Sequence, residues 1–181
     1  VDEAKLPNGL HSLVERVKAC GLKFGIWMEP EMISPDSELY RAHPDWALHL
    51  NGREGTQGRE QFVLDLSRKE VVDGIYEQIS AVIRSADISY VKWDMNRQLT
   101  DVGNAVLAPE RQGEIYHRYM LGVYEMQERL CHDFPDLLLE NCSGGGARFD
   151  AGMLYYSPQI WCSDDMDPVE RLSIQEGTAL V

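Results

Sequence analysis

Residues 88–94, ISYVKWD, decide the fold that this sequence predicts, because a short apolar strand here runs directly into a charged side chain. Three other apolar runs end in polar residues in the same way, and they cover residues 23–29 (KFGIWME), 137–142 (LLLENC) and 159–164 (QIWCSD). In a (β/α)8 barrel the catalytic residues follow the carboxyl ends of the strands. Four such strands in succession therefore favour a barrel.

Helices are expected between these strands, because apolar residues recur there at helical spacing. The predicted helices cover residues 7–20, 67–84, 109–131 and 171–180. Ser67 is expected to cap the second helix. Residues 31–60, which contain several Pro and Gly residues, are expected to form a long loop with one short helix. This alternation predicts an α/β fold, here a partial (β/α)8 TIM barrel of about four central βα units.

Composition and charge disfavour several classes of protein. The chain has 181 residues, 44% of them hydrophobic, and a formal net charge of −13. That charge repels nucleic acids and anionic membrane surfaces, so we expect neither as a partner. No apolar run approaches the roughly 20 residues of a membrane span. The glycines at 144–146 lack the G-x-G-x-x-G spacing, so an open nucleotide-binding sheet has weak support.

The cysteines and histidines also argue against several kinds of site. The four cysteines are widely spaced without a C-x-x-C pair, and the five histidines form no metal-ligand cluster. We therefore expect neither a metal site nor a cofactor. Reduced, partly buried thiols are typical of a cytoplasmic protein, which is the location we expect.

Asp94 is the first candidate for chemistry. It lies two residues after Lys92, so on a strand the two side chains face the same way. A neighbouring ammonium lowers the pKa of a carboxyl and keeps it ionised, which suits nucleophilic attack. The alternative is an ordinary ion pair at a strand end, and the pattern alone leaves both open.

Asp164 is the second candidate. Residues 161–167, WCSDDMD, crowd three carboxylates together, and like charges raise at least one pKa, which suits a general acid. A calcium loop is excluded, because the position that needs glycine holds another residue. Capping of the following helix is the favoured role for Asp165 and Asp167. A glycosidase needs two carboxylates in opposed settings, and Asp94 with Asp164 would supply them.

Aromatic and basic side chains near the strand ends suit a carbohydrate ligand. Trp27 and Trp161 could stack on the apolar face of a sugar, whereas Trp93 points away from Lys92 and is expected in the core. Arg59, in a Gly-rich loop, could donate paired hydrogen bonds to hydroxyl groups, although a surface role is the ordinary alternative.

Over nearly its whole length the chain resembles glycoside hydrolase family 36, the α-galactosidases that act on melibiose and raffinose-type sugars. The segments that carry the resemblance are FGIWMEPE (24–31), LDLS (64–67), KWDMNR (92–97), ENCSGGG (140–146), RFD (148–150) and SDD (163–165) with Asp167 and Arg171. Cys162 and Met166 stand where this family usually has Thr. These two departures concern fine specificity and not the class of reaction.

The resemblance implies a retaining α-galactosidase that works by double displacement, with Asp94 as nucleophile and Asp164 as general acid/base. The residues that it implies in the galactose pocket are Trp27, Arg59, Lys92, Cys142, Gly145 and Trp161. Residues 1–181 would be a fragment of a single TIM-barrel catalytic domain. The family's N-terminal β-sandwich and C-terminal β domain would lie outside the chain, and the full-length protein is expected to be a homo-oligomer.

Three alternatives stay open at this point. A related α-N-acetylgalactosaminidase would need room beside the sugar's 2-position, near Cys142. An α-galactosyl transferase would use the same carboxylates with a sugar as acceptor. A non-catalytic carbohydrate-binding remnant is disfavoured, because both carboxylates are present.

Overall fold

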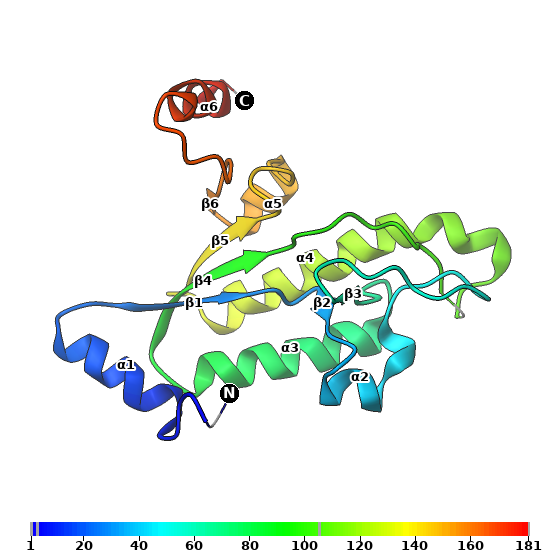
Figure 1. The fold of residues 1–181 in the computed structure, drawn as a ribbon, viewed down its shortest axis with the longest axis horizontal. Helices are drawn as coiled ribbons and strands as arrows, with labels where there is room; N and C mark the ends of the chain where they lie inside the picture. The colour runs from blue at the N-terminus through cyan, green and yellow to red at the C-terminus, as the bar shows by residue number, and fades with distance from the viewer. Residues whose placement is uncertain (1, 3, 105, 181) are drawn as a thin grey trace.

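A four-stranded parallel sheet forms the centre of the computed structural model, which describes residues 2, 4–104 and 106–180 (Figure 1). Its strands lie in the order β1-β4-β5-β6. Their bounds are Phe24–Met28 for β1, Ile88–Asp94 for β4, Leu138–Cys142 for β5 and Gln159–Ile160 for β6. All four predicted strands are confirmed, and so is the α/β class with a parallel sheet.

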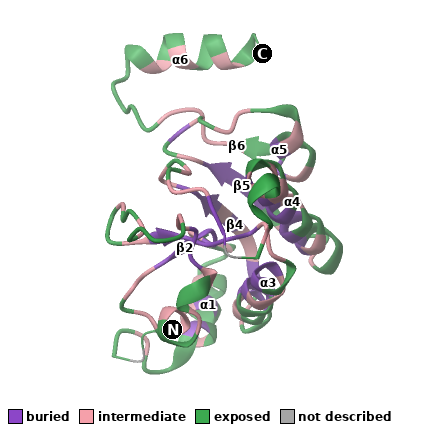
Figure 2. Ribbon diagram, turned by 90° about the vertical axis from the view of Figure 1, so that its right-hand side faces the viewer, coloured by how far each residue is buried: buried purple, intermediate pink, exposed green. Residues whose placement is uncertain are grey.

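Two long helices cover one face of the sheet. They are α3 (Lys69–Arg84) and α4 (Ile115–Asp133), and a shorter helix, α1 (Gly9–Ala19), precedes β1. Figure 2 shows that the buried residues gather on the sheet and on the sides of α3 and α4 that face it. The helices within the described residues are too short or too polar to cross a membrane.

Two smaller helices follow β5. The first, α5 (Ala151–Tyr156), packs against α4, and the second, α6 (Glu170–Ala179), extends away from the sheet (Figure 1). Every residue of α6 is at least partly exposed.

The segment expected to be a long loop contains more structure than predicted. A second sheet pairs β2 (Met32–Ile33) with β3 (Phe62–Val63) in antiparallel register, and between them lie α2 (Glu38–Ala42) and the 3-10 turn η1 (Pro44–Trp46). The four strand residues are buried. The largely apolar residues 62–66 indicate a short extended segment, and β3 lies there. Its pairing with β2 was not predicted, because two-residue strands are too short to show a period.

Two predicted helix starts were wrong. The second helix begins at Lys69, and Ser67 does not cap it, because its hydroxyl donates to Asp65 Oδ1 at 2.5 Å. Asp65 is 1% exposed, so this nearby donor offsets part of the cost of burying its carboxylate. The third helix is preceded by a separate 3-10 turn, η2 (Pro109–Glu114).

The two faces of the sheet differ in chemistry. Val91 and Trp93 of β4 are 0% exposed and lie on the face that the helices cover. The alternate residues of β4, including Lys92 and Asp94, lie on the opposite face, because successive side chains in a strand point to opposite sides. This second face is polar, and it carries the candidate site.

Candidate active site

The two candidate carboxylates share the carboxyl-end edge of the sheet, with β5 between them. Asp94 ends β4, and Asp164 follows the last residue of β6 by four positions. Each accepts a hydrogen bond from an indole: Trp27 Nε1 donates to Asp94 Oδ2 at 3.0 Å, and Trp161 Nε1 donates to Asp164 Oδ1 at 3.0 Å. Asp94 is buried whereas Asp164 is exposed, so the two groups have opposed surroundings.

Hydrogen bonds hold Asp94 in its ionised form. Burial alone raises the pKa of this carboxyl, but bonds from Asn96, Trp27 and Cys142 outweigh burial, so its pKa lies below the ordinary value. The amide of Met95 also donates to Asp94 Oδ1 at 2.9 Å. The predicted direction of the shift is confirmed.

The predicted cause of that shift was wrong. Lys92 Nζ lies 3.4 Å from Glu140 Oε1, so its ion-pair partner is not Asp94. Glu140 is the residue directly opposite Lys92 in the β4–β5 register. The ammonium also lies 4.6 Å from the centre of the Trp161 ring, a cation–π contact. Lys92 therefore belongs to a neighbouring cluster on the same face.

Cys142 stands directly beside the first carboxylate. It pairs with Asp94 in the β4–β5 register and is 3% exposed. Burial and the adjacent carboxylate raise the pKa of the Cys142 thiol to about 11. The neutral thiol can therefore donate to Asp94, and it is a poor nucleophile itself.

The glycine run after β5 lies against the backbone that carries the second carboxylate. A Cβ on Gly145 would lie 2.9 Å from Ser163 Cα and 3.1 Å from the amide nitrogen of Asp164. A Cβ on Gly146 would lie 2.6 Å from the carbonyl oxygen of Cys162. The sequence did not predict this contact. The glycine run and residues 162–164 are far apart in the chain, and the pairing of β5 with β6 brings them together.

Arg171 ties the start of α6 to the same segment. Its Nη1 donates to the carbonyl oxygen of Ser163 at 2.9 Å, and its guanidinium lies 5.0 Å from the Trp161 ring centre. Of the two predicted caps, Asp167 fits, since its Oδ1 accepts from the amides of Val169 (2.9 Å) and Glu170 (3.2 Å) at the start of α6. The prediction for Asp165 was wrong, because its Oδ1 accepts from the amide of Asp167 at 2.9 Å, ahead of the helix.

Arg59 reaches the site through residues that the sequence did not single out. Its Nη1 lies 2.8 Å from Glu29 Oε1, which also accepts from Asn96 Nδ2 at 2.6 Å. Asn96 in turn lies beside Asp94 and lowers the pKa of that carboxyl. A polar chain thus runs from Arg59 to the candidate nucleophile. Glu29 directly follows β1, and this position and its place in the FGIWMEPE segment were the sequence signals for its role.

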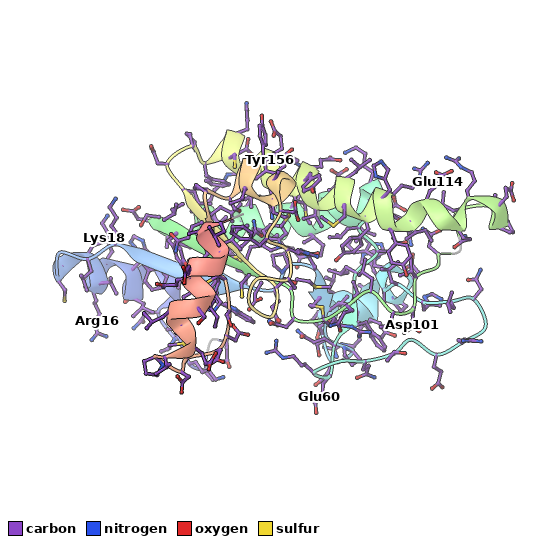
Figure 3. The ribbon with its side chains drawn as sticks, turned by 90° about the horizontal axis from the view of Figure 1, so that it is seen from above. Arg16, Lys18, Glu60, Asp101, Glu114 and Tyr156 are labelled. Atoms are coloured by element: carbon purple, nitrogen blue, oxygen red, sulfur yellow. The ribbon has the colours of Figure 1, made fainter. Side chains whose placement is uncertain are left out.

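The backbone of Arg59 is in the left-handed region, with φ of 55°, and so is that of Glu60, with φ of 59°. Such angles are uncommon for residues other than glycine. The amide of Thr56 donates to Asp101 Oδ2 at 2.7 Å, which joins this loop to the one that follows β4. Both loops lie on one side of the molecule, where Figure 3 labels Glu60 and Asp101.

The polar face therefore brings together most of the predicted residues, namely Trp27, Lys92, Asp94, Cys142, Gly145, Trp161 and Asp164. Trp93 and Asn141 point the other way, toward the helices: Trp93 is fully buried, as predicted, and Asn141 Oδ1 accepts from Gln127 of α4 at 3.0 Å. Within the described residues, no group of three His, Cys, Asp or Glu side chains is placed to hold a metal ion. An ionised carboxylate and an exposed one on a common edge suit acid/base-assisted displacement.

Known proteins resemble this chain over its whole length. The Melibiase family model matches residues 1–181. The chain belongs to this family, glycoside hydrolase family 36. Among its family relatives, α-galactosidase AgaA of Geobacillus stearothermophilus is 58% identical over 181 residues, which are 100% of this chain and 25% of that protein. Alpha-galactosidase 1 of Pediococcus pentosaceus is 55% identical over 180 residues, 99% of this chain and 25% of that protein.

A solved structure in family 36 has the same fold. The crystal structure of an AgaA variant from Geobacillus stearothermophilus in complex with raffinose matches this chain with a TM-score of 0.97 and 57% identity. The match covers 100% of this chain and 25% of that one. The chain thus spans about a quarter of the length of the relatives it matches.

Proposed function

We propose that residues 1–181 carry both catalytic carboxylates of a retaining α-galactosidase that hydrolyses terminal α-galactosyl residues of melibiose- and raffinose-type oligosaccharides. The observation that carries the proposal is the shared sheet edge of Asp94 and Asp164, each bonded to an indole and in opposed surroundings. Relatives at 55–58% identity are α-galactosidases, and structures of AgaA variants hold raffinose and stachyose.

We also propose that the sheet is part of a (β/α)8 barrel, with its polar face directed inward. Four βα units are about half of such a barrel. One domain fragment over residues 1–181 fits this arrangement, and the family's two β domains would lie elsewhere in the full-length protein. Cytoplasmic location and homo-oligomeric assembly stay predictions.

In the first step, the Asp94 carboxylate attacks the anomeric carbon while Asp164 gives its proton to the glycosidic oxygen. The bond from the anomeric carbon to that oxygen breaks, the leaving sugar departs with the proton, and a galactosyl ester of Asp94 remains. Asp164, now a carboxylate, then takes a proton from water, and the water oxygen displaces Asp94. Two inversions at the anomeric carbon give net retention.

The remaining site residues would bind the galactosyl group. Lys92 and Arg59 are charged donors for sugar hydroxyls, and each already has a carboxylate partner that orients it. Trp27 is 49% exposed, so its ring offers a free surface beside Asp94. Trp161 would supply a second aromatic wall next to Asp164.

Cys142 and Gly145 bear on the choice of sugar. Cys142 is buried against Asp94, and a Cβ on Gly145 would lie 3.1 Å from the amide nitrogen of Asp164. A wall this close to the nucleophile favours a 2-hydroxyl over a bulkier N-acetyl group. This favours an α-galactosidase over an α-N-acetylgalactosaminidase. Free galactose in the products would distinguish hydrolysis from transfer.

The test uses the full-length enzyme that contains these residues. Asp94→Ala should lower turnover of an activated aryl α-galactoside by on the order of 10³-fold or more. Azide should then restore part of the rate, and it should give the β-galactosyl azide, because it enters from the face that Asp94 vacates. Asp164→Ala with azide should give the α-azide instead.

Asp165→Ala is the matched control, since it removes an adjacent exposed carboxylate that has no proposed catalytic role. Its rate should stay within about fivefold of the wild type, as for an exposed position outside the reacting groups. Unchanged turnover in Asp94→Ala, or an α-azide from that variant, would overturn the assignment of the nucleophile.

A further inference from the structure

A buried ion pair lies beneath the site on the helix-covered side. Glu31 is 0% exposed and accepts four hydrogen bonds. Arg148 donates two of them, from Nη1 to Oε1 at 2.5 Å and from Nη2 to Oε2 at 2.7 Å. Trp93 Nε1 donates to Oε1 at 2.8 Å, and the Tyr119 hydroxyl donates to Oε2 at 2.5 Å. These four donors fill the acceptor sites of the carboxylate.

The pair joins elements that carry the two candidate catalytic groups. Trp93 directly precedes Asp94 in β4. Arg148 lies in the loop after β5, two residues beyond Gly146, and the amide of Phe149 donates to the carbonyl oxygen of Gly146 at 3.0 Å. Glu31 therefore connects the nucleophile strand to the tight turn that ends the glycine run.

That turn lies against the backbone that leads into the second carboxylate. The ideal Cβ positions of Gly145 and Gly146 lie 2.9 Å or less from backbone atoms of Ser163 and Cys162, so the two chain segments are in close contact. A shift of the turn would push directly on the backbone of Asp164. Arg148, which follows the turn, joins its far end to the buried carboxylate of Glu31.

Stability alone does not account for such a pair. Taking two charges out of water costs about as much as their attraction returns, and apolar residues of similar volume often serve as well. A bidentate guanidinium–carboxylate pair, however, fixes distance and angle more tightly than apolar packing does. A pair with this geometry suits a position where one backbone segment must be held against another.

We propose that Glu31 and Arg148 are positioning residues that hold the glycine turn, and through it Asp164, at the correct distance from the glycosidic oxygen. The inference rests on the proposed function, because it concerns the acid step of that reaction. Neither residue would touch the reacting atoms.

The test compares two substrates in the full-length enzyme. Raffinose has a sugar leaving group that needs a proton from Asp164, whereas a nitrophenyl α-galactoside has a leaving group that departs with little protonation. The ratio of the two kcat/KM values therefore reports acid assistance, because kcat/KM covers steps up to the first bond cleavage. In Arg148→Lys and Glu31→Gln, kcat/KM for raffinose should fall about tenfold more than kcat/KM for the aryl substrate. Tenfold is less than the roughly 100-fold or more that a general acid contributes, because Asp164 is displaced and not removed.

Arg129→Lys is the matched control. Arg129 Nη1 lies 2.7 Å from Asp73 Oδ1, in a half-buried pair between α4 and α3. The same substitution there removes a guanidinium–carboxylate contact between two helices without touching the glycine turn, so the substrate ratio should stay at the wild-type value. Equal losses for both substrates in Arg148→Lys would show a merely structural role and overturn the proposal. If Glu31→Gln fails to fold, Arg148→Lys decides alone. A wild-type enzyme that cleaves neither substrate would instead contradict the proposed function.

Discussion

Replacing Gly145 with alanine should damage the acid step more than the fold. Gly145 has φ of +87°, and a Cβ there would lie 2.9 Å from Ser163 Cα and 3.1 Å from the Asp164 amide nitrogen. Carbon atoms in contact ordinarily stay about 3.5–4.0 Å apart, so the two segments must separate by about 0.6 Å or more. Both contacts are to backbone, so no side-chain rotation can relieve them.

The size of the effect follows from this displacement. A shift of about 1 Å in a catalytic group can cost about 100-fold in rate, so we expect kcat/KM for raffinose to fall by about 10- to 100-fold. The left-handed backbone adds a stability cost of about 1–2 kcal/mol for a residue with a Cβ. Steady-state kinetics and denaturant unfolding of the full-length enzyme measure the two effects separately.

Gly144→Ala is the control for backbone strain. Gly144 also has a positive φ, +53°, but an added Cβ there would have no heavy atom of the described residues within 4 Å. It should lose a similar stability of about 1 kcal/mol and keep its activity within about twofold. Equal activity in the two variants would refute the claim that Gly145 sets the position of Asp164.

Two further predictions concern the first carboxylate and its neighbours. Trp27→Phe removes a hydrogen bond that favours ionised Asp94, so the pKa of Asp94 should rise, and the acid limb of the kcat/KM–pH profile should move to higher pH; a limb that stays in place contradicts this. Glu29→Gln removes the charge that holds Arg59 while it keeps an acceptor for Asn96, so KM for raffinose should rise about tenfold with a smaller change in kcat; inhibition constants for galactose provide a check, and an unchanged KM would rule out the role of Glu29 in binding.

From the sequence it could be predicted which residues lie at the site, but not which partners their side chains contact there. Asp94 and Lys92 lie on one face of β4, as their spacing requires. Their separate partners depend on the β4–β5 pairing, which sets Lys92 opposite Glu140 and Asp94 opposite Cys142. A register between strands almost 50 positions apart has no local signal in the chain.

The same limit applies to the fold. Long helices such as α3 were predicted from the helical spacing of their apolar residues. The β2–β3 sheet was missed, because a strand of two residues is too short to show an alternating pattern. Glu31 and Arg148 each belong to a recognised motif, but they lie 117 positions apart, and only the folded chain brings them together. Ser67 was wrongly predicted to cap α3. Its hydroxyl donates to the buried carboxylate of Asp65 and does not bond to the first amides of the helix.

In the proposed mechanism Asp94 forms a covalent bond to galactose, and that bond can be trapped and located in the chain. The full-length enzyme would be treated with an activated, fluorinated α-galactoside that slows hydrolysis of the intermediate, then digested and examined by peptide mass spectrometry. We expect one added fluorogalactosyl group on the peptide that contains Asp94, and no such label in Asp94→Ala. A label on Asp164 or on any other residue would show that Asp94 is not the nucleophile.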